Sequence, residues 1–415
     1  MTPTAPTTAQ PSQVAATRMT PLEKRASLSL AAIFALRMLG LFLVLPVFML
    51  EARHYPGGDD PALIGMAMGA YGLTQAFMQM PLGLASDRFG RKRVIVLGLG
   101  VFALGSVVAA LAPSVHWLLV GRALQGLGAI SAAVTALLAD LTRDEVRTKG
   151  MAMVGASIGL MFALSLVVAP PLAGALGLPG VFGLTALLAA AGIAVVLRWT
   201  PPEPAHIANA PRGRLRDVLW HPALWRLNLG VFVLHAVQLA MWMAVPALLT
   251  QTGLQPAQHW QVYLPAVLAS FVLLGGLFAL ERRGHLRGVL RAAIGLLLWV
   301  QVGFVWVASS GALLWPLVTL LFLFFVSFNI LEASQPSLVS RLAPPESRGA
   351  ALGVYNTLQS LGFFVGGAVG GALVKWGGTQ VLFLACAALV AVWLLLGWGQ
   401  KVPPVAPRRP SAGAA

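Results

Sequence analysis

The sequence predicts an all-α membrane protein of twelve transmembrane helices, arranged as two pseudo-symmetric bundles of six. Hydrophobic residues make up 58% of the 415 positions and charged residues only 10%, whereas about 25% charged is usual for soluble domains. Apolar runs of roughly 20 residues, long enough to cross about 30 Å of hydrocarbon, recur along the chain. The composition therefore indicates a multi-pass protein in contact with the lipid bilayer.

The polar segments divide the chain into five parts. Residues 1–26 are rich in Thr, Pro, Ala and Gln and are predicted to be a disordered cytoplasmic tail. A Pro- and Arg-rich linker at 199–222 separates a first bundle, 27–198, from a second, 223–399, and a second tail covers 400–415. The predicted spans lie near 27–50, 62–83, 93–112, 115–138, 150–172, 180–198, 223–249, 261–280, 289–309, 312–334, 349–373 and 378–399.

Two short sequences near the starts and ends of spans recur in both halves. Asp87-Arg88-Phe89-Gly90 is echoed by Glu281-Arg282-Arg283-Gly284, and Glu145-Val146-Arg147 by Glu346-Ser347-Arg348. Two related bundles facing each other across a pseudo-two-fold axis are the architecture of many secondary transporters, with the substrate site between the bundles.

The distribution of positive charge predicts the orientation in the membrane. The chain has a formal charge of +15, but all except four of its 28 Lys and Arg residues fall in segments predicted to be cytoplasmic. Arg53 and Lys375 are expected outside, and Arg37 and Arg122 within the membrane. This asymmetry follows the positive-inside rule and is unlike a phosphate-binding stripe, so nucleic acid is not an expected partner. Both termini are predicted to be cytoplasmic.

One short loop between two spans holds the densest group of charges. The sequence Gly83-Leu84-Ala85-Ser86-Asp87-Arg88-Phe89-Gly90-Arg91-Lys92-Arg93 has one acid and four bases. A carboxylate at the end of a span is suited to face the N-terminus of another helix, where it gains about 0.3–1 kcal/mol. The alternative is a loop that only fixes orientation and forms local salt bridges.

Three ionisable residues inside apolar runs are functional candidates. A guanidinium at the bilayer centre costs at least about 2.5–3.5 kcal/mol on insertion scales, so Arg37 and Arg122 should face water or a partner. Glu332 is the only acid well inside a predicted span, and it is the preferred group for binding the coupled proton. The alternatives are hydrogen bonding of the arginines to neighbouring carbonyls and a gate ion pair of Glu332 with Arg341 or Arg348.

Polar side chains at helical spacing form three stripes that could line a substrate cavity. Amides and rings around an apolar cavity suit amphipathic or aromatic compounds, although interhelical hydrogen bonding would also explain each residue. The stripes are Tyr71, Gln75 and Gln79 on the second span; His235, Gln238 and Trp242 on the seventh; and Tyr355, Asn356 and Gln359 on the eleventh.

Together, these motifs resemble the major facilitator superfamily, specifically the YajR-like part of its drug:proton antiporter branch. The loop 83–92 matches the family pattern G-x-L-x-D-R-x-G-R-K, and Gly121-Arg122-Ala123-Leu124-Gln125-Gly126-Leu127-Gly128-Ala129 is similar to its fourth-helix pattern. The resemblance implies that Asp87 faces the eleventh helix near Gly349, with Gly83 allowing close approach. It also implies a bridge from Arg91 to Asp140, and a role in proton coupling for Arg122.

The predicted function is proton-coupled efflux of small amphipathic compounds by alternating access in a bacterial inner membrane. In the fifth-helix antiporter pattern, other small residues such as Ala156 and Ser165 replace most of the glycines. An uptake symporter for a metabolite therefore stays as the alternative, and a non-transporting sensor is a further one. The chain has no Gly-Lys dipeptide for a Walker A loop and no metal-ligand motif. No cofactor, enzymatic activity or obligate protein partner is expected; the expected partners are protons, lipid and a small molecule.

Overall fold

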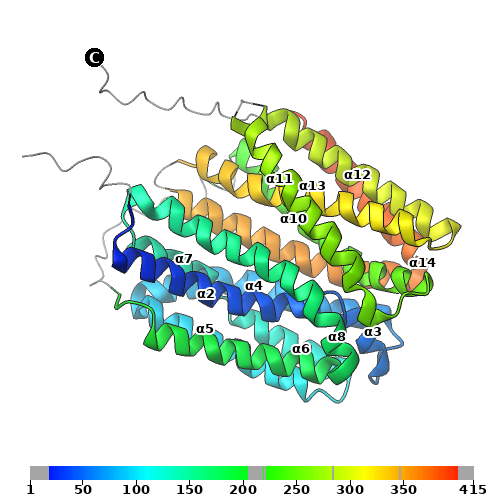
Figure 1. Ribbon diagram of the computed structural model, residues 1–415, viewed down its shortest axis with the longest axis horizontal. Helices are drawn as coiled ribbons and strands as arrows, with labels where there is room; N and C mark the ends of the chain where they lie inside the picture. Colours follow the sequence, from blue (N-terminus) through cyan, green and yellow to red (C-terminus); the bar gives the residue numbers. More distant parts are fainter. Residues whose placement is uncertain (1–17, 204–217, 219–220, 283–284, 345–346, 401–415) are drawn as a thin grey trace, which may run out of the picture.

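The computed structural model describes residues 18–203, 218, 221–282, 285–344 and 347–400, and within these ranges the chain is helical without strands. The helices lie side by side along one common direction, with the N-terminal half in the lower part of Figure 1 and the C-terminal half in the upper part. The structure thus confirms an all-α fold with two helical halves.

The N-terminal half begins earlier than the sequence indicates. Its first helix starts at Pro21 rather than at residue 27, because a capping box forms there: the Thr20 hydroxyl accepts from the backbone N–H of Glu23, and the Glu23 carboxylate accepts from the backbone N–H of Thr20. The elements of this half are α2 (Pro21–Val44), α3 (Phe48–Glu51), η1 (Ala52–His54), α4 (Pro61–Phe89), α5 (Arg91–Ala110), α6 (Val115–Leu127), α7 (Ser131–Asp140) and α8 (Asp144–Arg198).

The C-terminal half repeats the arrangement of long helices joined by short turns. Most of the linker that precedes this half, residues 204–217, lies outside the described residues. The elements are α10 (Pro222–Gln251), η2 (Pro256–Gln258), α11 (Trp260–Arg282), α12 (Leu286–Ser310), α13 (Leu314–Leu342) and α14 (Arg348–Gly397).

Two of these helices, α8 and α14, are double spans that fold back at a glycine. Gly177 interrupts α8 with φ 62° and ψ −165°, and Gly378 interrupts α14 with φ 71° and ψ −175°. Only glycine adopts such angles at little cost. The two glycines are 201 positions apart, the same separation as Glu145-Val146-Arg147 and Glu346-Ser347-Arg348. The repeat inferred from sequence therefore extends to the position and geometry of a backbone kink.

Nine helices of the described part are long and apolar enough to cross a membrane. Counting α8 and α14 as two spans each gives eleven. The helix α4 is not among the nine, since Thr74, Gln75, Gln79 and the charges near its end lower its hydropathy. The number of twelve therefore stays a prediction, with α4 as the twelfth.

The two ends of the bundle differ in charge. We call the end where α2, α5, α8 and α12 begin the arginine-rich end; it lies on the left of Figure 1 and includes Arg25, Arg91, Arg143 and Arg291. The other end, where α4 begins, is the Asp60 end. Large apolar side chains such as Leu97, Leu187 and Trp315 are more than half exposed on the outer surface, as expected of helices that face lipid.

Candidate functional site

Two buried arginines of the N-terminal half share one tyrosine. Arg37 of α2 is 0% exposed and donates from Nη2 to the hydroxyl of Tyr71 at 2.8 Å and from Nη1 to Ser131 at 3.4 Å. Arg122 of α6 lies over the ring of Tyr71, 4.9 Å from the centroid, and donates to Gln125 Oε1 at 2.8 Å. Tyr71 thus gives Arg37 an acceptor and Arg122 an aromatic face.

The glycines around Arg122 place it at a helix crossing. A Cβ on Gly121 would lie 2.7 Å from Ala109 of α5, and one on Gly126 would lie 2.2 Å from the carbonyl oxygen of Tyr71. The fourth-helix pattern therefore brings α6 close to both α4 and α5. Gln125 completes the network by donating to Ser106 of α5 at 2.8 Å.

A carboxylate, an imidazole and an amide meet in the C-terminal half. His235 Nε2 of α10 lies 3.3 Å from Glu332 Oε2 of α13 and 2.7 Å from Gln359 Nε2 of α14. Gln359 also donates to Glu332 Oε1 at 3.4 Å. The structure therefore joins three of the residues singled out from the sequence into one cluster. The gate pair of Glu332 with Arg341 or Arg348 stays a hypothesis.

The hydrogen-bond partners of His235 fix the tautomer of its neutral ring. Nδ1 lies 2.9 Å from the carbonyl oxygen of Val231, and since a carbonyl only accepts, Nδ1 holds a hydrogen. Nε2 then carries the lone pair and accepts from the Gln359 amide at 2.7 Å. The Glu332 side chain is 37% exposed, whereas His235 is only 2% exposed. The cluster thus joins a buried base to an accessible acid.

A small cavity lies between the two halves. Tyr71 and Arg122 line it from the N-terminal half, and Leu239 and Phe363 line it from the C-terminal half. The ring of Phe363 makes an edge contact with His235 at 4.9 Å between centroids. The arginine pair and the His235 cluster are therefore on opposite sides of one mostly apolar cavity.

The remaining stripe residues divide into two groups. Gln79, Gln238, Trp242 and Tyr355 are buried, and each has a polar atom without a hydrogen-bond partner, as expected of groups that bind water or a ligand. Gln75 and Asn356 are only partly buried, and none of these six residues is among those that line the cavity. The described residues hold no group of three side chains suited to a metal ion.

The loop motif brings Gly83 against α7 rather than against the eleventh helix. A Cβ on Gly83 would meet Ala132 of α7 at 3.4 Å, and one on Gly349 would meet nothing within 4 Å. Asp87 forms an ion pair with Arg91 of its own loop. Its expected contact with the start of the eleventh helix stays a prediction, because residues 345–346, just before α14, lie outside the described residues.

The expected bridge within the motif is present. Arg91 Nε lies 3.2 Å from Asp140 Oδ2, and Gly90 turns the chain between α4 and α5 with φ 97°. A second carboxylate, Glu203, accepts from the backbone N–H groups of Arg91 at 2.7 Å and Lys92 at 3.2 Å. Arg88 stacks its guanidinium over Phe89, 5.4 Å from the ring centroid. Sequence reasoning missed Glu203, which follows Pro201 and Pro202 in the predicted linker.

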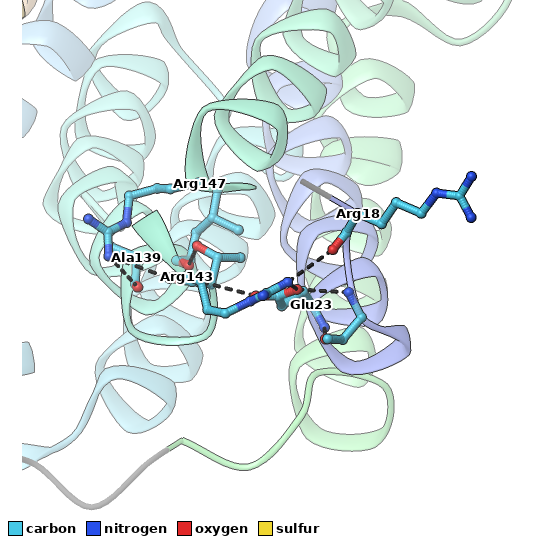
Figure 2. Close-up of polar contacts among 8 residues, drawn as sticks. Arg18, Glu23, Ala139, Arg143 and Arg147 are labelled. Atoms are coloured by element: carbon cyan, nitrogen blue, oxygen red, sulfur yellow. Dashed lines mark hydrogen bonds and ion pairs between the residues drawn. The ribbon is translucent and has the colours of Figure 1, made fainter. Parts of the chain in front are cut away.

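A neighbouring ion pair ties α2 to the loop before α8 (Figure 2). Arg143 donates from Nε to Glu23 at 2.7 Å and from Nη2 to the carbonyl oxygen of Arg18 at 2.9 Å, while Arg147 donates to the carbonyl oxygen of Ala139 at 3.2 Å. No role for Arg143 is expected from the sequence, and Glu23 falls within the predicted tail, residues 1–26. The Thr20-Pro21-x-Glu23 capping pattern is the signal that could have found it.

At the Asp60 end, by contrast, the two halves are in close contact through glycine. A Cβ on Gly65 of α4 would lie 2.2 Å from the carbonyl oxygen of Gly367, and one on Gly371 would lie 2.3 Å from that of Pro61. Lys375 Nζ of α14 pairs with Asp60 Oδ2 at 2.8 Å. The structure is therefore closed at the Asp60 end.

Two related helical halves around a central cavity, closed at one end, define the class of secondary transporters. The family model described as Major Facilitator Superfamily matches residues 26–367 and, in a second match, residues 336–415. The chain belongs to the Major Facilitator Superfamily and is a multi-pass membrane transporter, not an enzyme.

Individual relatives agree with this assignment. The chain is 43% identical over 392 residues to the inner membrane transport protein YajR of Escherichia coli K12, which covers 93% of this chain and 86% of that protein. It is 27% identical over 386 residues to multidrug resistance protein 2 of Bacillus subtilis 168, covering 88% and 92%. The crystal structure of the human organic anion transporter TETRAN superposes with a TM-score of 0.67 at 19% identity, covering 91% and 100%.

Proposed function

We propose that this protein exports small amphipathic compounds across a bacterial inner membrane in exchange for protons. The observation that carries the proposal is the cluster of His235, Glu332 and Gln359 beside the central cavity. Proton coupling needs a group that is charged in one conformation and neutral in another. A partly exposed carboxylate that pairs with a buried imidazole meets this requirement.

The cluster also offers a way to link the proton to helix movement. A proton that arrives on Glu332 removes the charge that attracts a protonated His235, so the contact between α13 and α10 weakens. Because Phe363 touches His235 and lines the cavity, a change at the cluster reaches the cavity wall directly. Protonation and substrate occupancy would then favour different packings of the same three helices.

The cavity supports the substrate class. Its lining surface is apolar, although Arg122 and Tyr71 are among the residues that form it, and such sites bind compounds with a large apolar part. Relatives named multidrug resistance proteins, from Bacillus subtilis and Aeromonas salmonicida, match over most of the chain. With the arginine-rich end in the cytoplasm, as the positive-inside rule favours, the closed Asp60 end faces away from the cytosol, where an exporter collects its cargo.

The test uses purified protein in liposomes with an imposed pH gradient. Glu332→Gln is expected to lower the rate of proton-driven transport at least tenfold, because the amide keeps the shape of the side chain but binds no proton. Exchange of substrate without a gradient should continue. Glu51→Gln at the Asp60 end is the matched control and should leave both activities unchanged. Proton-driven transport by E332Q at the wild-type rate would contradict the proposal. Substrate that moves only in the same direction as the proton would indicate the uptake alternative.

A further inference from the structure

A second pocket lies inside the C-terminal half at the arginine-rich end, apart from the central cavity. Residues of α10, α12, α13 and α14 line it. Its polar lining includes Arg226, Arg287, Arg291 and Gln335, and its apolar walls include Leu331 and Trp393. None of the described residues that line it is acidic.

The three arginines converge on the carbonyl groups of the two residues that follow α14. Arg287 Nη2 donates to Trp398 O at 3.4 Å, Arg226 Nη1 donates to Gly399 O at 3.4 Å, and Arg291 donates to Trp398 O while its guanidinium lies 4.3 Å from the ring centroid of Trp398. The partial negative charge at a helix C-terminus offsets about half of one positive charge. Three guanidinium groups with five N–H donors each exceed what these two carbonyls accept.

Gln335 is the observation that points to a ligand. Its side chain is only 2% exposed, and neither its Oε1 nor its Nε2 has a hydrogen-bond partner. Gly230 makes room for it, since a Cβ there would lie 2.8 Å from Gln335 Oε1. A buried amide without partners is costly, so its position on the wall of a cavity rimmed by arginines indicates that a polar group from outside the chain satisfies it.

The N-terminal half shows how the same architecture is completed when the chain supplies the anion. There Arg25 Nε donates to Trp199 O at 2.8 Å and Lys92 Nζ to Thr200 O at 2.9 Å. These partners parallel Arg226, Arg291 and Trp398 in the other half. The carboxylate of Glu203 follows Thr200 and binds the start of α5. In the C-terminal half the corresponding residues fall in 401–415, a segment of the sequence without Asp or Glu.

We propose that this cavity binds the phosphate group of an anionic amphiphile, with the phosphate on Arg226, Arg287 and Arg291 and an ester or hydroxyl oxygen on Gln335. Arginine binds phosphate in a bidentate fork, and the Leu331 and Trp393 walls offer apolar contact to the part of the amphiphile next to the phosphate. Basic pockets between transmembrane helices bind lipid headgroups in this way. Free phosphate shares the anionic chemistry but not the apolar contacts.

The test measures binding to the full chain in a neutral detergent by native mass spectrometry and thermal shift. The probes are short-chain phosphatidylglycerol, short-chain phosphatidylcholine and inorganic phosphate. Phosphatidylglycerol is expected to bind most tightly, and Arg287→Gln or Gln335→Leu to weaken it about tenfold, as loss of one charge-assisted or buried hydrogen bond predicts. Arg93→Gln is the matched control, because Arg93 is an exposed base at the same end in the other half.

Each outcome decides the proposal. Inorganic phosphate binding as tightly as phosphatidylglycerol, with the same loss in R287Q, would keep the phosphate site but assign it to a free anion. Equal binding of phosphatidylcholine and phosphatidylglycerol, or an equal loss in R93Q and R287Q, would overturn it. Should R287Q or Q335L fail to fold, Q335E gives an independent measurement: a carboxylate from the chain should raise the unfolding temperature and remove the stabilisation by phosphatidylglycerol.

Discussion

Tyr71 is the residue on which the buried charges of the N-terminal half depend. A guanidinium in the membrane interior is expensive, and the structure contains Arg37 and Arg122 without an acidic partner among the contacts described for them. The Tyr71 hydroxyl accepts from Arg37 and its ring face attracts Arg122. One side chain therefore stabilises two cations through two different parts.

This division of roles predicts the effect of removing the hydroxyl alone. Tyr71→Phe leaves the ring under Arg122 but removes the acceptor of Arg37, which should cost about 1–3 kcal/mol and lower the apparent unfolding temperature by roughly 2–6 °C. The double variant R37M/Y71F also removes the guanidinium that has lost its acceptor, so part of the lost stability should be recovered. Thermal unfolding in detergent checks both, with Tyr55→Phe as the control; equal stability of Y71F and the double variant would contradict the account.

At this scale, single residues could be selected from the sequence but not grouped. Arg37, Arg122 and Glu332 stand out because a charge in an apolar run is rare. That Tyr71 joins the two arginines, and that His235 and Gln359 flank Glu332, depends on helices far apart in the chain. Periodicity gives the face of a helix and not its neighbour.

Among the elements, α14 has the most demanding packing. One of its glycine faces meets α4 through Gly367 and Gly371, and another meets α10 through Gly362 and Gly366, where a Cβ would lie 2.4 Å and 2.2 Å from carbonyl oxygens of α10. Small residues at this spacing allow helix backbones to touch in membranes. Because α4 and α10 belong to different halves, α14 fixes the closed Asp60 end.

Enlarging one glycine of the α4 face should open this end. Gly65→Ala places a methyl group 2.2 Å from the carbonyl oxygen of Gly367, so α4 and α14 must separate. Spin labels at positions 54 and 376, both exposed, should move apart in a variant with the buried Cys386 replaced by Ala. Gly100→Ala, where a Cβ meets nothing within 4 Å, is the control and should leave the distance unchanged. An unchanged distance in G65A would show that this contact does not hold the end closed.

The glycine pattern of these faces was readable in the sequence, as Gly65-x-x-x-Gly69 and Gly362-x-x-x-Gly366. The sequence also predicted the helical halves, the linker and the internal repeat, since hydropathy and charge encode them directly. It did not predict the first helix turn at Pro21, where a capping box rather than hydropathy decides the start.

For the whole molecule, the conformation is what sequence reasoning could not supply. A transporter with alternating access has one sequence for at least two arrangements, so a contact expected from the sequence, such as that of Asp87 with the eleventh helix, need not be made in the arrangement in which Lys375 contacts Asp60. The pseudo-two-fold relation, visible in the kinks at Gly177 and Gly378, gives both halves similar geometry. An interaction at one end that is made in only one arrangement shifts the equilibrium between the arrangements.

The pair of Asp60 and Lys375 is such an interaction, and it predicts a pH dependence. Lys375 lowers the pKa of the Asp60 carboxyl below its ordinary value of 3.8. In a state with this end open the pair is separated and the pKa returns toward that value. The pair therefore favours closure at pH values above 3.8, and its contribution is lost as the pH falls through the lower pKa of the paired state.

Labels at positions 54 and 376 again give the measurement. Acidification below about pH 4, near the ordinary pKa of Asp, should increase the open fraction of the wild type by at most about fivefold, since exposed pairs contribute about 0.2–1 kcal/mol. The Asp60→Asn variant should already have the larger open fraction at neutral pH, because Asn keeps the cap on α4 but cannot ionise. Acidification should then cause no further change through position 60. Asp59→Asn, an exposed neighbour, should behave like the wild type. If D60N and the wild type respond equally to acid, another group controls closure at this end.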